Sequence, residues 1–184
     1  MSHLILAAKE DNQIQARKYL VLCLARSLNF AVTKLSGDEK SQGSKIILIP
    51  IPSRKAADRV RGLAHVELLV KLLVRESNEY DIKILNCLQH AKKISDQSTL
   101  NFNERELNMR GAFIINRRFN NEIVQLRADQ TGTSHPRITK TLLFLVDDLV
   151  TTGTTIQAAN MALNHRGLRV DGTLASCATN GFTH

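Results

Sequence analysis

The stretch "TLLFLVDDLVTTGTT", residues 141–155, decides the fold of this 184-residue chain. It begins with a continuous apolar run that ends in Asp147 and Asp148. Such a run predicts a strand over residues 141–148, buried on both faces of a sheet. Threonines around one glycine follow, and the pattern then predicts a helix over residues 154–167. A buried strand that passes through a short loop into a helix is the repeating unit of a parallel α/β sheet.

Strands and helices alternate through the rest of the chain as well. We expect strands over residues 46–51, 81–88, 111–119 and 169–178, and helices over 14–28, 61–77 and, more briefly, 104–109. Loops are expected over 34–45 and 89–103, and a surface hairpin or insertion over 120–140. This order predicts an α/β fold: one domain over residues 1–184, with a Rossmann-like, mostly parallel sheet flanked by helices.

Composition narrows the class of protein. Hydrophobic residues make up 43% and charged residues 23%, as in an ordinary globular domain. The net charge of +8 favours anionic partners, although it could equally serve only solubility. Aromatic residues make up 4% and Trp is absent, which argues against base stacking as the main activity.

The three cysteines form no C-x-x-C pair, so neither a zinc ribbon nor a disulfide framework is supported. The N-terminus does not resemble a signal peptide, and no apolar run approaches the ~20 residues that span a bilayer. We therefore expect a soluble cytoplasmic protein that does not interact with membranes.

The loop after residues 141–148 has the chemistry of a phosphate site. Backbone N–H groups of a loop and of a helix N-terminus attract anions. Gly153 lets the backbone approach a ligand closely. Small hydroxyl donors surround it: Thr151, Thr152, Thr154 and Thr155. A phosphate monoester fits such a loop.

Asp147 and Asp148 would repel that phosphate, so they must face another part of the ligand. The diol of a ribose or a hard cation such as Mg²⁺ would suit them. One alternative is that the acids merely end a strand and the threonines form a turn with a helix cap. A Walker B strand of an NTPase is rejected, because "GDEKSQGSK" (37–45) has the wrong glycine spacing for a phosphate-binding loop and leads into a strand.

These residues carry a family resemblance. "FLVDDLVTTGTT" resembles the phosphoribosyl-pyrophosphate (PRPP) motif of type I phosphoribosyltransferases. Three further segments are similar to the ComF/GntX-like family: "ILAAKEDNQIQARKYLVLCLARSL" (5–28), "IPIPSRKAADRVRGLAHVELL" (49–69) and "DQSTLNFNERELNMRGAF" (96–113). The chain departs from that family in lacking an N-terminal zinc ribbon. It also carries Leu63, Ala64 and His65 where Phe-Asn-Gln is common.

The resemblance implies a type I phosphoribosyltransferase-like fold and an enzyme that binds PRPP with Mg²⁺. It implies that PRPP is held by Asp147, Asp148, Thr151, Thr152, Gly153, Thr154 and Thr155. Pyrophosphate would be held by Ser53, Arg54 and Lys55, and the catalytic residues would be Asp147, Asp148 and Arg54. A lid loop would carry Lys92, Lys93, Gln97 and Arg105. Asp147 and Asp148 would contact the metal indirectly, through ligand or water.

Such an enzyme would pass the phosphoribosyl group to a nitrogen acceptor that the sequence does not identify. The ligand would be PRPP or a nucleoside monophosphate, and a homodimer is expected. Two other readings stay open. The chain could be a non-catalytic protein that binds single-stranded DNA, as in DNA uptake, or a regulator that senses PRPP without turnover.

Overall fold

The computed structural model describes residues 14–36, 44–53, 64–91, 111–132 and 140–178. A four-stranded, fully parallel sheet forms its centre, with the strand order β2-β1-β5-β6. The strands are β1 (Ser44–Pro50), β2 (Asp81–Ile84), β5 (Lys140–Val150) and β6 (Gly172–Ala178). The predicted α/β fold with a Rossmann-like parallel sheet is confirmed.

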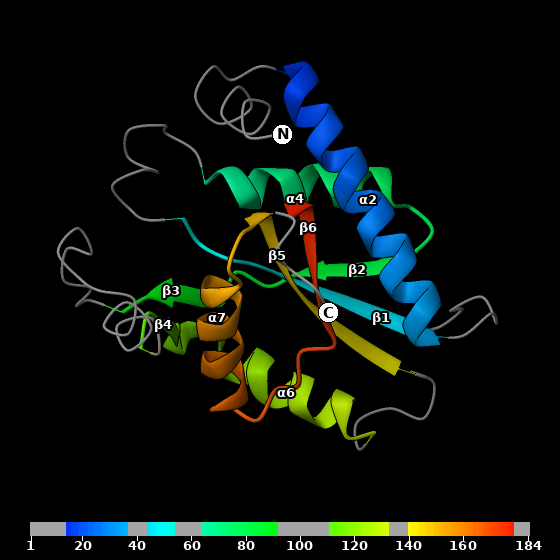
Figure 1. Cartoon of the computed structure of the whole chain (residues 1–184). Coiled ribbons are helices and arrows are strands. Elements are labelled where there is room, and N and C mark those ends of the chain that lie inside the picture. Colours follow the sequence, from blue (N-terminus) through cyan, green and yellow to red (C-terminus); the bar gives the residue numbers. More distant parts are fainter. Residues whose placement is uncertain (1–13, 37–43, 54–63, 92–110, 133–139, 179–184) are drawn as a thin grey trace, which may run out of the picture.

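Helices cover both faces of this sheet (Figure 1). The helices α2 (Ile14–Ser36) and α4 (His65–Glu76) pack on one face. The helices α6 (Asn120–Gln130) and α7 (Thr154–Asn164) pack on the other. A short antiparallel pair, β3 (Leu88–His90) and β4 (Phe113–Ile115), lies beside α7 (Figure 1). The molecule is thus a three-layer sandwich in which the sheet is the middle layer.

The strand β5 supplies side chains to both halves of the core. Leu142, Phe144 and Val146 pack towards α2 and α4, and Leu143 and Leu145 pack towards α6 and α7. All five side chains are fully buried. This alternation follows from the two-residue period of a strand, and it explains why residues 142–146 of β5 are apolar without interruption.

Several predicted boundaries change. The strand expected over residues 81–88 is interrupted: β2 stops at Ile84 and β3 begins at Leu88. The strand expected over 111–119 is reduced to β4, which a 3₁₀ turn follows (η2, Arg117–Phe119). A strand of three residues is too short to show a clear hydrophobic period. The sequence therefore does not separate β3 or β4 from the segments next to them.

Residues 120–130 of the expected surface hairpin or insertion (120–140) do not form a hairpin, and residues 133–139 lie outside the described residues. Residues 120–130 form α6, which buries Ile123 and Leu126 against the sheet. Only two apolar side chains, three residues apart, carry this contact, and polar residues surround them. The short helix expected over 104–109 lies outside the described residues. Among the described residues, none of the helices combines the length and the hydropathy that a membrane span requires.

Candidate functional site

The carboxyl ends of β1 and β5 lie side by side. The two strands pair in parallel up to Pro50 and Val146, and the Ile51 N–H then donates to the Val146 carbonyl oxygen at 2.9 Å. The first residue after β1 therefore stays beside β5, which continues four residues further, to Val150. In parallel α/β sheets, ligands bind at this edge. Ser53, just after β1, and Asp147, among the last four residues of β5, thus lie towards the same edge of the sheet.

A tight turn leads from β5 into α7. Gly153 has a φ of 74°, in the left-handed region, and stands directly before the first residue of α7. The hydroxyls of Thr152 and Thr154 are 2.8 Å apart and hydrogen-bonded. No side chain caps α7, so its first N–H groups have no partners within the helix. An uncapped helix start after a glycine turn is the arrangement that anion sites commonly use.

Asp147 and Asp148 have different surroundings. Asp147 is half-buried, and one of its carboxylate oxygens accepts the N–H of Asp148 at 2.8 Å. Asp148 is 4% exposed, and its Oδ2 lies 3.7 Å from Nε2 of His65, which is also 4% exposed. His65 is the first residue of α4, where the helix dipole favours a carboxylate. Asp148 is therefore directed towards α4, and alternation along the strand places Asp147 on the opposite face.

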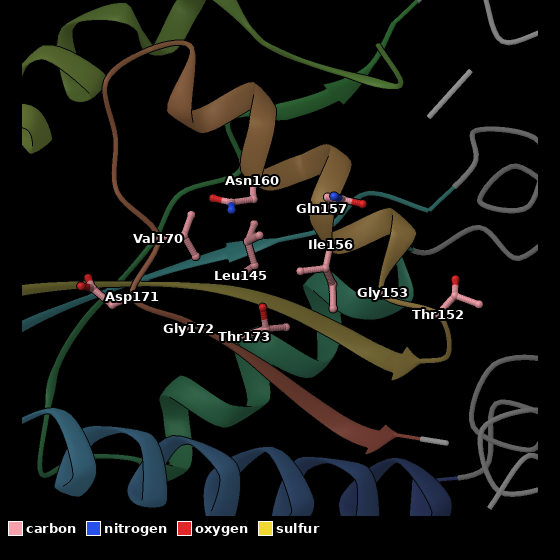
Figure 2. A pocket seen from close by; sticks show the side chains of 10 residues that line it. All are labelled: Leu145, Thr152, Gly153, Ile156, Gln157, Asn160, Val170, Asp171, Gly172 and Thr173. Carbon is pink, nitrogen blue, oxygen red and sulfur yellow. The ribbon is translucent and has the colours of Figure 1, made fainter. Parts of the chain in front are cut away.

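A groove runs from this turn along α7 (Figure 2). We call it the α7–β6 groove; its volume is about 420 Å³. Thr152 and Gly153 line one end, Gln157 and Asn160 line the α7 side, and Thr173 of β6 lies on the floor.

Asp171 lines the far end of the α7–β6 groove, but its carboxylate already forms hydrogen bonds within the fold. Its carboxylate accepts the N–H of Leu143 at 2.9 Å and the guanidinium of Arg169 at 3.0 Å. The α7–β6 groove is thus polar on its α7 side. The carboxylate of Asp171, the only one among the described residues of its lining, is already paired with Arg169.

A second pocket lies beyond the exit of β1, on the side of β2. We call it the β1–β3 pocket; its volume is about 370 Å³. The chain after β1, the start of α4 and the β3–β4 pair surround it. The buried side chains of Ile51, Val66 and Leu88 form its apolar lining. Its polar lining consists of Ser53, Glu67, Asn86, Gln89, His90, Asn116 and Arg118.

His90 ties the β3–β4 pair to the segment after β1. Its Nε2 lies 3.0 Å from the carbonyl oxygens of both Pro52 and Ser53. Because both neighbours are acceptors, Nε2 carries the hydrogen and donates it. The ring also packs on Phe113, with the ring centroids 4.9 Å apart. The β1–β3 pocket is therefore bounded by two segments held together by one imidazole.

The structure brings together Ser53, Asp147, Asp148 and the turn over residues 151–155 at one edge of the sheet. The other predicted site residues, Arg54, Lys55, Lys92, Lys93, Gln97 and Arg105, lie outside the described residues.

Sequence reasoning did not find the β1–β3 pocket. A signal was present, because Asn86 lies near the end of the predicted strand 81–88 and Gln89 and His90 follow it, and this place at its carboxyl end could have indicated a shared edge. The pocket was not expected, because β3 and β4 are too short to be predicted from the sequence.

Within the described residues, no group of three or more His, Cys, Asp or Glu side chains could hold a metal ion. Mg²⁺ commonly binds through one or two carboxylates together with the phosphates of a substrate. Asp147, which is half-buried near the end of β5, fits that role only together with a phosphorylated ligand.

No protein-family model matches the chain, and no curated protein matches its sequence. The family resemblance therefore depends on the motifs themselves.

Proposed function

We propose that this protein is a phosphoribosyltransferase-like enzyme of the ComF/GntX-like type, which binds PRPP with Mg²⁺ and transfers its phosphoribosyl group to a nitrogen acceptor. The observation that carries the proposal is the end of β5, where Asp147 lies among the last four residues of the strand and a left-handed glycine turn then leads into the uncapped start of α7. A carboxylate that can accept hydrogen bonds from hydroxyl groups and a turn that can hold a phosphate thus follow one another along the chain. The motif resemblance supports the same assignment.

The roles of the site residues follow from the charges of the ligand groups that they would bind. The turn over residues 151–155 holds the 5-phosphate, and Asp147 accepts hydrogen bonds from the ribose diol. Ser53, with Arg54 and Lys55, holds the pyrophosphate. The acceptor nitrogen attacks C1 of the ribose, the bond from C1 to the pyrophosphate oxygen breaks, and the electron pair leaves with pyrophosphate. Bound Mg²⁺ would neutralise charge on the phosphates, and fixed cations at the leaving group stabilise the transition state.

Calorimetric titration with PRPP and Mg²⁺ tests the binding step. We expect saturable binding by the wild type and at least a roughly tenfold loss in Asp147→Asn, because the amide no longer offers a charged acceptor to the diol. Asn160→Leu, in the α7–β6 groove and away from the turn, is the matched control. Absence of PRPP binding by the wild type would refute the proposal.

Release of pyrophosphate with a panel of bases and amines tests turnover. An enzyme releases it only when the right acceptor is present. A regulator that senses PRPP would bind it with the same dependence on Asp147 and release nothing.

A second candidate function, binding of single-stranded DNA, is favoured by the outer face of α2. Tyr19 is 50% exposed and Phe30 is 69% exposed on this helix. The helix contains Arg17, Lys18, Arg26 and Lys34 but no Asp or Glu. The two rings are separated by eleven positions, roughly 16 Å along a helix, and could each stack on a base while the cations contact phosphates.

Fluorescence anisotropy with labelled oligo-dT measures this candidate. Combined Tyr19→Ala and Phe30→Ala should weaken binding, whereas Val124→Ala, an exposed apolar residue on α6, should not. If DNA binding survives Asp147→Asn with Asp148→Asn while PRPP never binds, the second candidate replaces the first.

A further inference from the structure

We propose that a pocket between β2 and α6 binds a small organic anion, in which a phosphate or carboxylate group is joined to an apolar body. We call it the β2–α6 pocket; its volume is about 410 Å³. It lies on the face of the sheet that α6 covers, and its lining includes neither Ser53 nor the turn over residues 151–155. The inference therefore goes beyond the proposed function and names a second ligand site.

The pocket exists because α6 does not cover β2. Among the described strands, α6 packs mainly on β5. Ile47 of β1 pairs in register with Lys83 of β2, and Leu85 follows Lys83 by two residues. Because side chains alternate along a strand, these three side chains point to the face on which α6 lies. A hollow remains between this helix and the outer strand of the sheet.

The floor of the β2–α6 pocket is apolar. Ile47, Leu85 and Leu126 line it, and all three belong to the buried layer between the sheet and α6. The aliphatic stems of lysine and arginine side chains at the rim extend this apolar surface. A bare inorganic ion would lose hydration here without compensation, whereas the apolar part of an organic anion can lie on the floor.

The rim carries two cations that are not neutralised. Lys83 and Arg118 line the pocket and are exposed. Within the part of the chain that the structure describes, neither forms an ion pair. A third cation in the lining, Lys45, is already paired with Asp129 at 3.2 Å. A phosphate or carboxylate near Lys83 and Arg118 would gain charge-assisted hydrogen bonds from both.

Arg118 is oriented by its own segment. Its guanidinium carbon lies 4.7 Å from the centre of the Phe119 ring, and its backbone N–H donates to the side chain of Asn116 at 3.1 Å. A guanidinium that is already oriented loses less conformational freedom when an anion binds. Arg118 also lines the β1–β3 pocket, so Lys83 is the cation that distinguishes the two sites.

Glu122 limits how much negative charge the site accepts. It is the one carboxylate among the described residues of the lining. Asp81 lies two residues before Lys83 in β2 but does not line the pocket. Glu122 would repel the anionic group and could accept a hydrogen bond from a hydroxyl or N–H on the apolar body. Removal of this charge should therefore strengthen the binding of a simple anion.

Compounds that share one ring system and differ in charge test the proposal. The full chain is titrated by fluorescence with naphthyl phosphate, naphthoate and the neutral naphthamide, and by calorimetry with inorganic phosphate. We expect at least one naphthyl anion to bind about tenfold or more tightly than both naphthamide and inorganic phosphate. The tighter of the two naphthyl anions identifies the anionic group that the site prefers.

Four variants locate the binding. Lys83→Gln and Arg118→Gln should each weaken the naphthyl anion by about fivefold or more. Glu122→Gln should strengthen it by about threefold, a gain that a loss of structure would not produce. Arg117→Gln is the matched control, because it removes a cation from the adjacent position outside the lining and should leave the affinity unchanged.

Equal or tighter binding of naphthamide or inorganic phosphate overturns the proposal, and so does an affinity that Lys83→Gln leaves unchanged. A naphthyl anion that is weakened by Gly153→Ala but not by Lys83→Gln occupies the turn before α7. One that is weakened by Arg118→Gln alone occupies the β1–β3 pocket, and either result excludes the β2–α6 pocket. PRPP is absent from all these titrations, so failure of the proposed function would leave their outcome unaffected.

Discussion

Two adjacent residues of the same type can have different roles when they lie in a strand, because their side chains point to opposite faces of the sheet. Asp147 and Asp148 are adjacent, but successive side chains of a strand point to opposite faces. Asp148 is buried beside His65 at the start of α4, and Asp147 is half-buried among the last four residues of β5. From the sequence, the pair was expected to face one ligand together. The structure assigns the two carboxylates to different environments, which makes their separate replacement informative.

We expect Asp148→Asn to lower the free energy of unfolding by about 1–3 kcal/mol, because a buried carboxylate beside His65 is replaced by an amide that must find new partners. Asp147→Asn should change it by less than about 0.5 kcal/mol and instead weaken PRPP binding. Urea unfolding and calorimetry measure the two effects. Equal stability losses in the two variants would contradict this division.

The thiol of Cys87 should be inert in the folded protein. Burial between β2 and β3 raises its pKa to about 12 from the ordinary value of 9.0. Cys23 and Cys177 are partly exposed. Iodoacetamide at pH 8.5 should therefore modify Cys23 and Cys177 but not Cys87, and all three should react in urea. Peptide mass spectrometry distinguishes the three sites.

The same pKa shift makes stability depend on pH. The unfolded chain releases this proton near pH 9, whereas the folded chain keeps it until about pH 12. The free energy of unfolding therefore falls as the pH rises through that window. Cys87→Ala should have a smaller slope there than the wild type.

At the scale of elements, the turn between β5 and α7 depends on one backbone conformation. Gly153→Ala places a Cβ at a φ of 74°, which costs about 1–2 kcal/mol. Gly132→Ala is a matched control, because Gly132 has the same φ, has open space around it and lies after α6. Both variants should lose similar stability in urea unfolding, and only Gly153→Ala should also bind PRPP more weakly.

The elements differ in how far the sequence revealed them. The strands β1 and β5 could be predicted because both faces of each are buried, so residues 46–49 and 142–146 form continuous apolar runs. The helix α6 was missed because Ile123 and Leu126 are its only buried side chains. Contact with the sheet, rather than the local pattern of apolar residues, determines that this segment forms a helix. The proximity of His65 to Asp148 was likewise invisible, since it depends on how α4 packs across β5.

At the scale of the whole molecule, the sheet separates two apolar layers. Phe144 belongs to the layer with α2 and α4, and Leu145 belongs to the layer with α6 and α7. Phe144→Leu and Leu145→Val should each lower the free energy of unfolding by about 1–2 kcal/mol. Because they share no packing partners, the double variant should lose the sum to within about 0.5 kcal/mol. A larger coupling in urea unfolding would show that the two layers respond as one.

The pairing of β5 with strands on both sides has a consequence for how this protein can vary. Adding or deleting a single residue within β5 would exchange the faces to which its side chains point. The carboxylate beside His65 would move to the face that α6 and α7 cover, its neighbour would move to the face that α2 and α4 cover, and both apolar layers would be disrupted at once. Changes of chain length should therefore accumulate in the connections and be absent between residues 140 and 150.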